Sequence, residues 1–122
     1  MKLITPLAAL ALAACATIPP TPAGPTAGFG QVAYSNGVRF RPLQLLEDSR
    51  CPTNVQCVWA GRLKVRTEVS GSGWSQTRDL ELGVPQAVAE YRVALISAEP
   101  PKQAGAEIDP RAYRFTYTAS GR

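Results

Sequence analysis

Three cysteines offer the clearest chemistry in this chain, and two of them lie close together. Cys51 and Cys57 are separated by five residues, a spacing that lets the chain between them close into a small loop. In an oxidising compartment such a pair forms a disulfide, which the chain-entropy model credits with roughly 2 to 2.5 kcal/mol. A two-thiol redox site and half of a metal site are the alternatives, but the chain has no Cys-x-x-Cys spacing and no histidine. We therefore predict a disulfide.

The third cysteine, Cys15, follows a segment with the features of an export signal. Lys2 precedes an apolar run from Leu3 to Ala14 that is too short to span a bilayer. The small residues before Cys15 suit cleavage that would leave it as an acylated N-terminus, with residues 1–14 as a lipoprotein signal peptide. An ordinary secretory signal and a retained short anchor are the alternatives. The lipoprotein interpretation attaches the protein to a membrane through Cys15.

The residues that catalysis most often uses are missing or isolated. The chain contains no histidine, the commonest general base and transition-metal ligand. Ser49 follows Asp48 without a histidine to complete a triad. Glu47 and Asp48 form an adjacent carboxylate pair that could serve a small hydrolase, although adjacent acids are more often exposed strand ends. We predict that the protein is not an enzyme and has no catalytic residue, cofactor or metal.

The stretch from Asp48 to Gly61 has the composition of a structured connection between two strands. Its turn-forming residues and its disulfide account for a stapled connection without a ligand. Within it, Trp59 is predicted to cover the disulfide, and Gly61 to allow a close backbone approach or a bulge. The functional alternative is a pre-organised loop that a partner contacts. Its candidate binding residues are Thr53, Asn54, Val55, Gln56 and Trp59.

The elements that must position this loop are predicted to be strands. Apolar residues alternate from Val38 to Glu47, with a bulge or sheet edge expected at Pro42, and from Leu63 to Val69. Further alternating segments are 74–82, 91–95 and 113–117, and 85–90 is a candidate for one helical turn. Turns are expected at 35–37 and 71–73. The aromatic residues expected to pack in the core are Trp74, Tyr91, Tyr113 and Tyr117. The predicted fold is all-β, a small antiparallel sandwich or barrel of about six strands, stapled by one disulfide, after a disordered tether.

Composition divides the chain into a signal, a tether and one domain. Residues 15–30 are rich in proline and glycine, a composition that favours extended polyproline geometry and could lift a domain roughly 40 Å from a membrane. Residues 31–122 are expected to form a single β domain. The net charge is +4, but the basic residues are scattered among acids, so we expect no nucleic-acid partner. A short basic stripe, Arg62, Lys64 and Arg66, is interpreted as a solvent face.

The residues around the disulfide resemble a motif of small bacterial envelope proteins for which no activity is established. The residues that carry the resemblance are Asp48, Ser49, Arg50, Cys51, Pro52, Val55, Cys57, Trp59, Ala60 and Gly61. The likeness is specific over about residues 38–69 and weaker over 91–101. It implies a β-rich exported domain and transfers no catalytic or binding residue.

These observations predict a lipid-anchored protein of the bacterial cell envelope. Ala16 and Thr17, with no aspartate after Cys15, resemble the outer-membrane sorting signal of Gram-negative lipoproteins, which favours an outer-membrane location facing the periplasm. The expected role is non-catalytic binding or scaffolding, with an envelope protein or a glycan as the partner. Two alternatives remain, an inhibitor that presents the Cys51–Cys57 loop to an envelope-attacking enzyme and a small cell-wall hydrolase.

Overall fold

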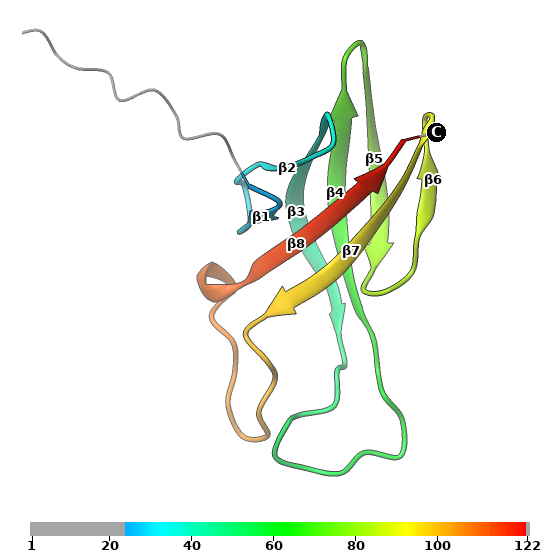
Figure 1. Cartoon of the computed structure of the whole chain (residues 1–122). Helices are drawn as coiled ribbons and strands as arrows, with labels where there is room; N and C mark the ends of the chain where they lie inside the picture. Colours follow the sequence, from blue (N-terminus) through cyan, green and yellow to red (C-terminus); the bar gives the residue numbers. More distant parts are fainter. Residues whose placement is uncertain (1–23, 122) are drawn as a thin grey trace, which may run out of the picture.

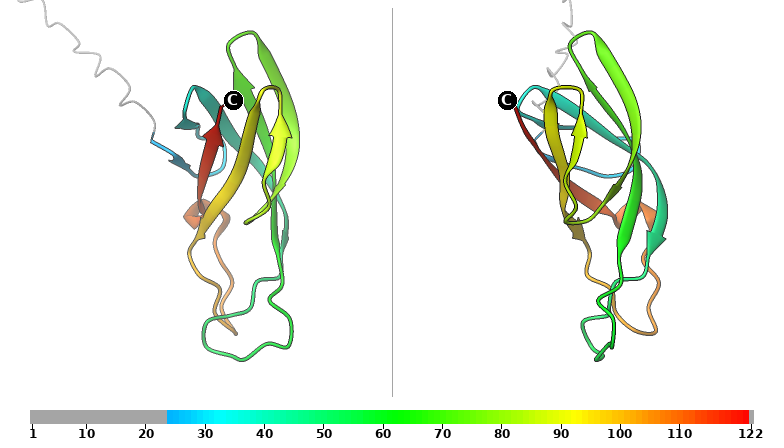
Figure 2. Two further views of the ribbon diagram at one scale, coloured as in Figure 1. Left: turned by 45° about the vertical axis from the view of Figure 1, so that its right-hand side comes forward. Right: turned by 90° about the vertical axis from the view of Figure 1, so that its right-hand side faces the viewer.

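A computed structural model describes residues 24–121 as two four-stranded antiparallel sheets packed face to face (Figures 1 and 2). The predicted signal peptide and Cys15 lie outside the described residues. One sheet has the order β2-β3-β4-β5 and the other the order β1-β8-β7-β6. The first contains β2 (Ala33–Ser35), β3 (Val38–Asp48), β4 (Leu63–Gly71) and β5 (Trp74–Glu81). The second contains β1 (Thr26–Ala27), β6 (Gln86–Val88), β7 (Tyr91–Glu99) and β8 (Arg114–Ser120), and a short 3-10 helix, η1 (Pro110–Ala112), precedes β8. The predicted all-β fold is confirmed as a sandwich.

Turn chemistry and a bulge set the register of β3. Asn36 and Gly37 both have positive φ, 50° and 83°, as the two-residue turn of a tight hairpin requires. The hairpin pairs Ser35 with Val38. The pairing of β3 with β4 then shifts between Pro42 and Gln44, because proline has no N–H to donate to the ladder. The predicted bulge at Pro42 is therefore confirmed.

The alternating residues of both sheets meet in one core. Every second residue of β4, from Leu63 to Val69, points inward and is buried. Phe40 of β3 stacks on Tyr117 of β8, with ring centroids 4.7 Å apart. The Tyr117 hydroxyl lies 3.0 Å from the hydroxyl of Thr67, which is also fully buried. This contact satisfies two polar groups that would otherwise be costly to bury.

Of the four aromatic residues predicted to pack in the core, two are buried and two are half-buried. Tyr113 and Tyr117 are buried, as predicted for core residues. Trp74 and Tyr91 are half-buried and pack against each other at one end of the sandwich, with ring centroids 6.1 Å apart.

Three predictions about the organisation of the chain were wrong. Residues 24–30, predicted as tether, belong to the domain, because Thr26 and Ala27 pair with β8 and Phe29 packs on the core. Over residues 24–121 there are eight strands rather than about six, since three strands are only two or three residues long and leave little periodic signal. The segment 85–90 contains β6 instead of a helical turn, because its backbone pairs with β7.

Two long connections leave the same end of the sandwich. One joins β3 to β4 and contains both cysteines, and the other leads from β7 to η1. They lie side by side at the lower end of the molecule in Figures 1 and 2. The candidate binding loop is therefore carried on two strands from one sheet and braced by a connection from the other.

Candidate binding loop

The disulfide forms as predicted and closes the loop. Cys51 and Cys57 are bonded, with their Cα atoms 5.9 Å apart, inside the range that the bond geometry permits. The backbone N–H of Cys51 also donates to the Ala60 carbonyl, and that of Val55 donates to the Pro52 carbonyl. The loop from Cys51 to Cys57 is thus constrained by the disulfide and by backbone hydrogen bonds.

The two ends of the loop are held together where they leave the strands. The Ser49 hydroxyl accepts a hydrogen bond from the Arg62 N–H at 3.0 Å and lies 3.1 Å from the Arg62 carbonyl oxygen, to which it donates. Gly61 has a φ of +68°, and a Cβ at this position would overlap the Ser49 carbonyl. The predicted close approach at Gly61 is confirmed, because only glycine combines this backbone conformation with so little space.

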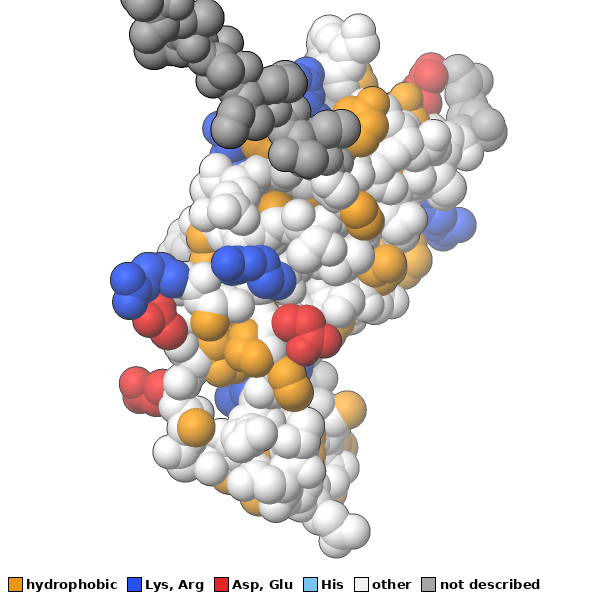
Figure 3. All heavy atoms as spheres, turned by 60° about the vertical axis from the view of Figure 1, so that its left-hand side comes forward, with side chains coloured by type: hydrophobic (Ala, Val, Ile, Leu, Met, Phe, Trp, Pro, Cys, Tyr) orange, Lys and Arg blue, Asp and Glu red, His pale blue; other side chains and the backbone are white. Residues whose placement is uncertain are grey.

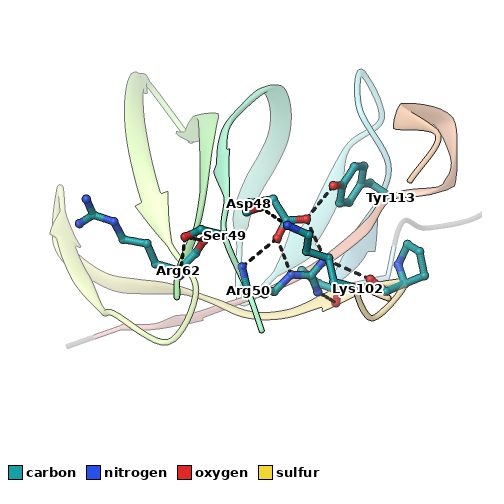
Figure 4. Close-up of polar contacts among 8 residues, drawn as sticks. Asp48, Ser49, Arg50, Arg62, Lys102 and Tyr113 are labelled. Carbon is teal, nitrogen blue, oxygen red and sulfur yellow. Dashed lines mark hydrogen bonds and ion pairs between the residues drawn. The ribbon is translucent and has the colours of Figure 1, made fainter. Parts of the chain in front are cut away.

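Asp48 forms a hub that ties the loop to the second sheet (Figure 4). Its carboxylate accepts hydrogen bonds from Arg50 Nε at 2.8 Å, Arg50 Nη2 at 3.0 Å and the Tyr113 hydroxyl at 2.7 Å. Arg50 in turn donates to the backbone carbonyls of Ala98 and Pro100. The side chains of Asp48 and Arg50 are only 7% and 14% exposed. This ion pair is therefore shielded from solvent and bridges β3 to the end of β7.

The hub changes the proton affinity of its members. Burial raises the pKa of Asp48, but hydrogen bonds from Arg50 and Tyr113, together with the positive charge of Arg50, outweigh burial and hold the pKa below its ordinary value of 3.8. Burial and the hydrogen bond to Asp48 raise the pKa of Tyr113 to about 12. The carboxylate therefore stays charged, and the phenol neutral, at neutral pH.

The connection between β7 and η1 braces the loop from one side. Lys102 Nζ donates to the Asp48 carbonyl at 2.7 Å. The Thr53 N–H donates to the Lys102 carbonyl, and Asn54 Oδ1 accepts from the Ala104 N–H, both at 2.8 Å. Two of the predicted binding residues thus form hydrogen bonds within the protein, Thr53 through its backbone and Asn54 through its side chain. Thr53 and Asn54 position the loop.

The loop is uncharged and exposes three apolar side chains. Trp59 is 82% exposed and Val58 89% exposed, and Val55 is also exposed. The sequence from Cys51 to Gly61 contains no charged residue, and the lower end of the face in Figure 3 carries neither acidic nor basic side chains. We call Val55, Val58 and Trp59 the apolar tip. The prediction that Trp59 covers the disulfide was wrong, because its side chain lies in solvent instead of packing over the sulfurs.

The five predicted binding residues are all exposed. Asn54 differs from the others because its side-chain oxygen accepts from the Ala104 N–H, and Thr53 contributes its backbone N–H to the contact with Lys102. Sequence reasoning missed Val58, although its place directly before Trp59 in an uncharged stretch was a usable signal. It also missed Lys102, because its contact with Asp48 spans 54 residues and no local pattern encodes it.

The carboxylates that prompted the hydrolase alternative are engaged in ion pairs. Glu47 Oε2 lies 2.6 Å from Arg62 Nε, and Asp48 belongs to the hub. A general acid at neutral pH needs a raised carboxyl pKa, whereas the pKa of Asp48 is lowered. The geometry gives the hydrolase alternative no support.

Residues 24–121 contain no group of three or more histidine, cysteine, aspartate or glutamate side chains placed to hold a metal. No helix in the same range is long and apolar enough to cross a membrane.

Comparison with known proteins identifies no relative. A scan against protein-family models finds no match, and searches of curated proteins and of solved structures also find none. The motif resemblance around the disulfide therefore stays a prediction.

Proposed function

We propose that this protein is a non-catalytic binding module of the bacterial envelope, anchored by lipid at Cys15, and that its apolar tip is the surface that contacts the partner. The observation that carries the proposal is the exposed Trp59 on a braced, uncharged loop. Tryptophan, with tyrosine and arginine, is enriched among the residues that contribute most of the binding energy at protein interfaces. A partner with a concave apolar pocket would remove this surface from water.

Rigidity of the loop supports a binding role. Fixing the backbone of a flexible loop on binding costs about 1–2 kcal/mol for each residue. Here the disulfide, the Ser49–Arg62 contacts and the bracing by Lys102 have already ordered the backbone in the free protein. A convex loop held in this way suits insertion into a cleft.

The same observation favours one alternative, in which the partner is an enzyme that attacks the envelope and the loop blocks its cleft. Gln56 and the apolar tip would then make the inhibitory contacts, because Asn54 is committed to Ala104. Loss of inhibition in a Trp59→Ala variant, with an unchanged unfolding curve, would identify this alternative.

Site-specific photo-crosslinking in intact envelopes tests the proposal. A photoreactive benzoylphenylalanine replaces Trp59 in one variant and Ile96, an exposed residue of β7, in the control. We expect a discrete adduct from position 59 alone. Excess unlabelled wild-type protein should compete the adduct away, whereas a Trp59→Ala protein should compete about 30-fold less well, as loss of an interface centre worth about 2 kcal/mol requires. Equal adducts from both positions, or equal competition by both proteins, would refute the role of the tip.

The membrane anchor is tested separately by mass spectrometry of the protein isolated from envelopes. We expect an N-terminus at Cys15 that carries acyl chains, and release of the protein from membranes on Cys15→Ser substitution. An unmodified N-terminus would remove the anchor from the proposal and leave the role of the tip standing.

A further inference from the structure

We infer that the outer face of the β2-β3-β4-β5 sheet carries a second site, separate from the loop, which binds an acidic saccharide through Arg39 and Arg41. A hollow of about 380 Å³ lies on this face, a volume at the lower end of the range for small-molecule sites. The residues that line it and carry the argument are Arg39, Arg41, Glu68, Ser70, Trp74 and Ser75.

Strand register brings these side chains together. Arg39 lies opposite Ser70, and Ser70 lies opposite Ser75, so the three form one row across β3, β4 and β5. Arg41 lies opposite Glu68 in the next row that points to the same face. Residues two apart on a strand share a face and are separated by about 7 Å. The two guanidinium groups are therefore neighbours on one surface.

Within the described part of the chain, Arg39 and Arg41 differ from Arg62 and Arg66 because neither forms an ion pair. Arg62 pairs with Glu47 and Arg66 pairs with Asp79, so two of the three residues in the predicted basic stripe have acidic partners. Among residues 24–121, the side chains of Arg39 and Arg41 make no hydrogen bond or ion pair, and Arg41 does not form an ion pair even with Glu68 opposite it. Each guanidinium keeps its five N–H donors for a ligand.

Unused guanidinium groups on one face point to a carboxylate or phosphate, since both accept the forked hydrogen bonds that arginine donates. The rest of the hollow points to a sugar that carries the acid. Ser70 and Ser75 offer hydroxyls, and Glu68 offers a carboxylate that accepts from ligand hydroxyls.

Trp74 supplies the aromatic wall of the hollow. Gly71 makes room for it, because a Cβ at Gly71 would lie 2.5 Å from Trp74 Nε1. The Trp74 ring also packs against Tyr91 of β7 at this end of the sandwich. An amphipathic indole beside hydroxyls and charges matches the mixed apolar and polar surface of a saccharide.

Titration of the full-length protein with three probes tests the inference. The probes are a hyaluronan tetrasaccharide, which carries uronic carboxylates, neutral chitotetraose, and inorganic phosphate. Binding is followed by calorimetry and by amide chemical shifts. We expect saturable binding of the acidic tetrasaccharide, with shifts centred on residues 39, 41 and 74, and much weaker binding of the other two probes.

Single substitutions on the same face provide the matched comparison. Arg39→Gln and Arg41→Gln should each weaken binding of the acidic tetrasaccharide about tenfold, as loss of one charge-assisted hydrogen bond requires. Arg66→Gln removes the same charge from the same face and should change the affinity less than about twofold, because its charge is already paired. Unfolding curves of all three variants report whether the fold is intact.

Three results would overturn the inference. Chitotetraose binding as tightly as the acidic probe would exclude a role for the acid, and phosphate binding as tightly would exclude a role for the sugar. Equal losses from Arg39→Gln and Arg66→Gln would show only the net charge of the face. None of these results bears on the apolar tip, which lies at the end of the molecule reached by the β3–β4 connection (Figure 1).

Discussion

Replacing Asp48 by asparagine should destabilise the protein by about 2 kcal/mol, because it removes the charge at the centre of the hub. The substitution keeps the shape of the side chain but leaves Arg50, 14% exposed, without its counter-ion. Removing one partner of a fully buried ion pair costs about 3–5 kcal/mol. The cost should be smaller here because Arg50 keeps its hydrogen bonds to the carbonyls of Ala98 and Pro100.

The assay is equilibrium unfolding in urea at pH 7 with the disulfide intact, followed by tryptophan fluorescence and circular dichroism. Asp79→Asn is the matched control, because the Arg66–Asp79 pair has side chains 44% and 50% exposed, and a pair of this kind contributes about 0–1 kcal/mol. An Asp48→Asn/Arg50→Met double variant should be less destabilised than the sum of the two single variants. Equal effects of Asp48→Asn and Asp79→Asn, or strict additivity in the cycle, would refute the role of the hub.

Three further predictions concern pH and two sites in the fold. The folded pKa of Asp48 is lowered, so its stabilising effect should be complete above the unfolded pKa of about 3.9 and disappear as the pH falls through the folded value. The difference in unfolding free energy between wild type and Asp48→Asn, measured in urea from pH 7 to pH 2, should therefore shrink as the pH falls. A difference that stays constant over this range would contradict the prediction. Thr67→Val should cost about 1–2 kcal/mol in the same assay because it leaves the buried Tyr117 hydroxyl without its partner, and adding Tyr117→Phe should recover part of the loss. Gly61→Ala should destabilise the protein by about 2 kcal/mol. Gly73→Ala should destabilise it less, because Gly73 has a similar positive φ but open space around its Cβ position. Equal thermal unfolding midpoints for these two variants would show that the close approach at Gly61 carries no cost.

Local patterns were sufficient for the parts of this protein whose physics is local. The alternation from Leu63 to Val69 predicted a strand with one buried face, and the Asn36-Gly37 pair predicted a tight hairpin. The spacing of Cys51 and Cys57 predicted their disulfide. In each case the cause lies within a few residues of the effect, in side-chain periodicity, backbone conformation or loop closure.

The same reasoning placed the domain boundary too late because the boundary depends on partners far along the chain. Thr26 and Ala27 lie in a proline- and glycine-rich stretch, and they become a strand only by pairing with Thr116 and Phe115 of β8. A two-residue strand has no periodicity of its own to detect.

The amino-acid sequence by itself determined the all-β class, the central strands and the covalent loop, because these follow from the order of neighbouring residues. Only the tertiary structure decided what the loop and the outer face can offer to a partner. Asp48 and Arg50 meet Tyr113, Ala98 and Pro100 across the two sheets, and Trp59 lies in solvent. The arrangement of β3, β4 and β5 likewise decided that Arg62 and Arg66 form ion pairs, whereas Arg39 and Arg41 form none among residues 24–121. Exposure and charge pairing are properties of residues brought together from distant parts of the chain, so no local pattern contains them.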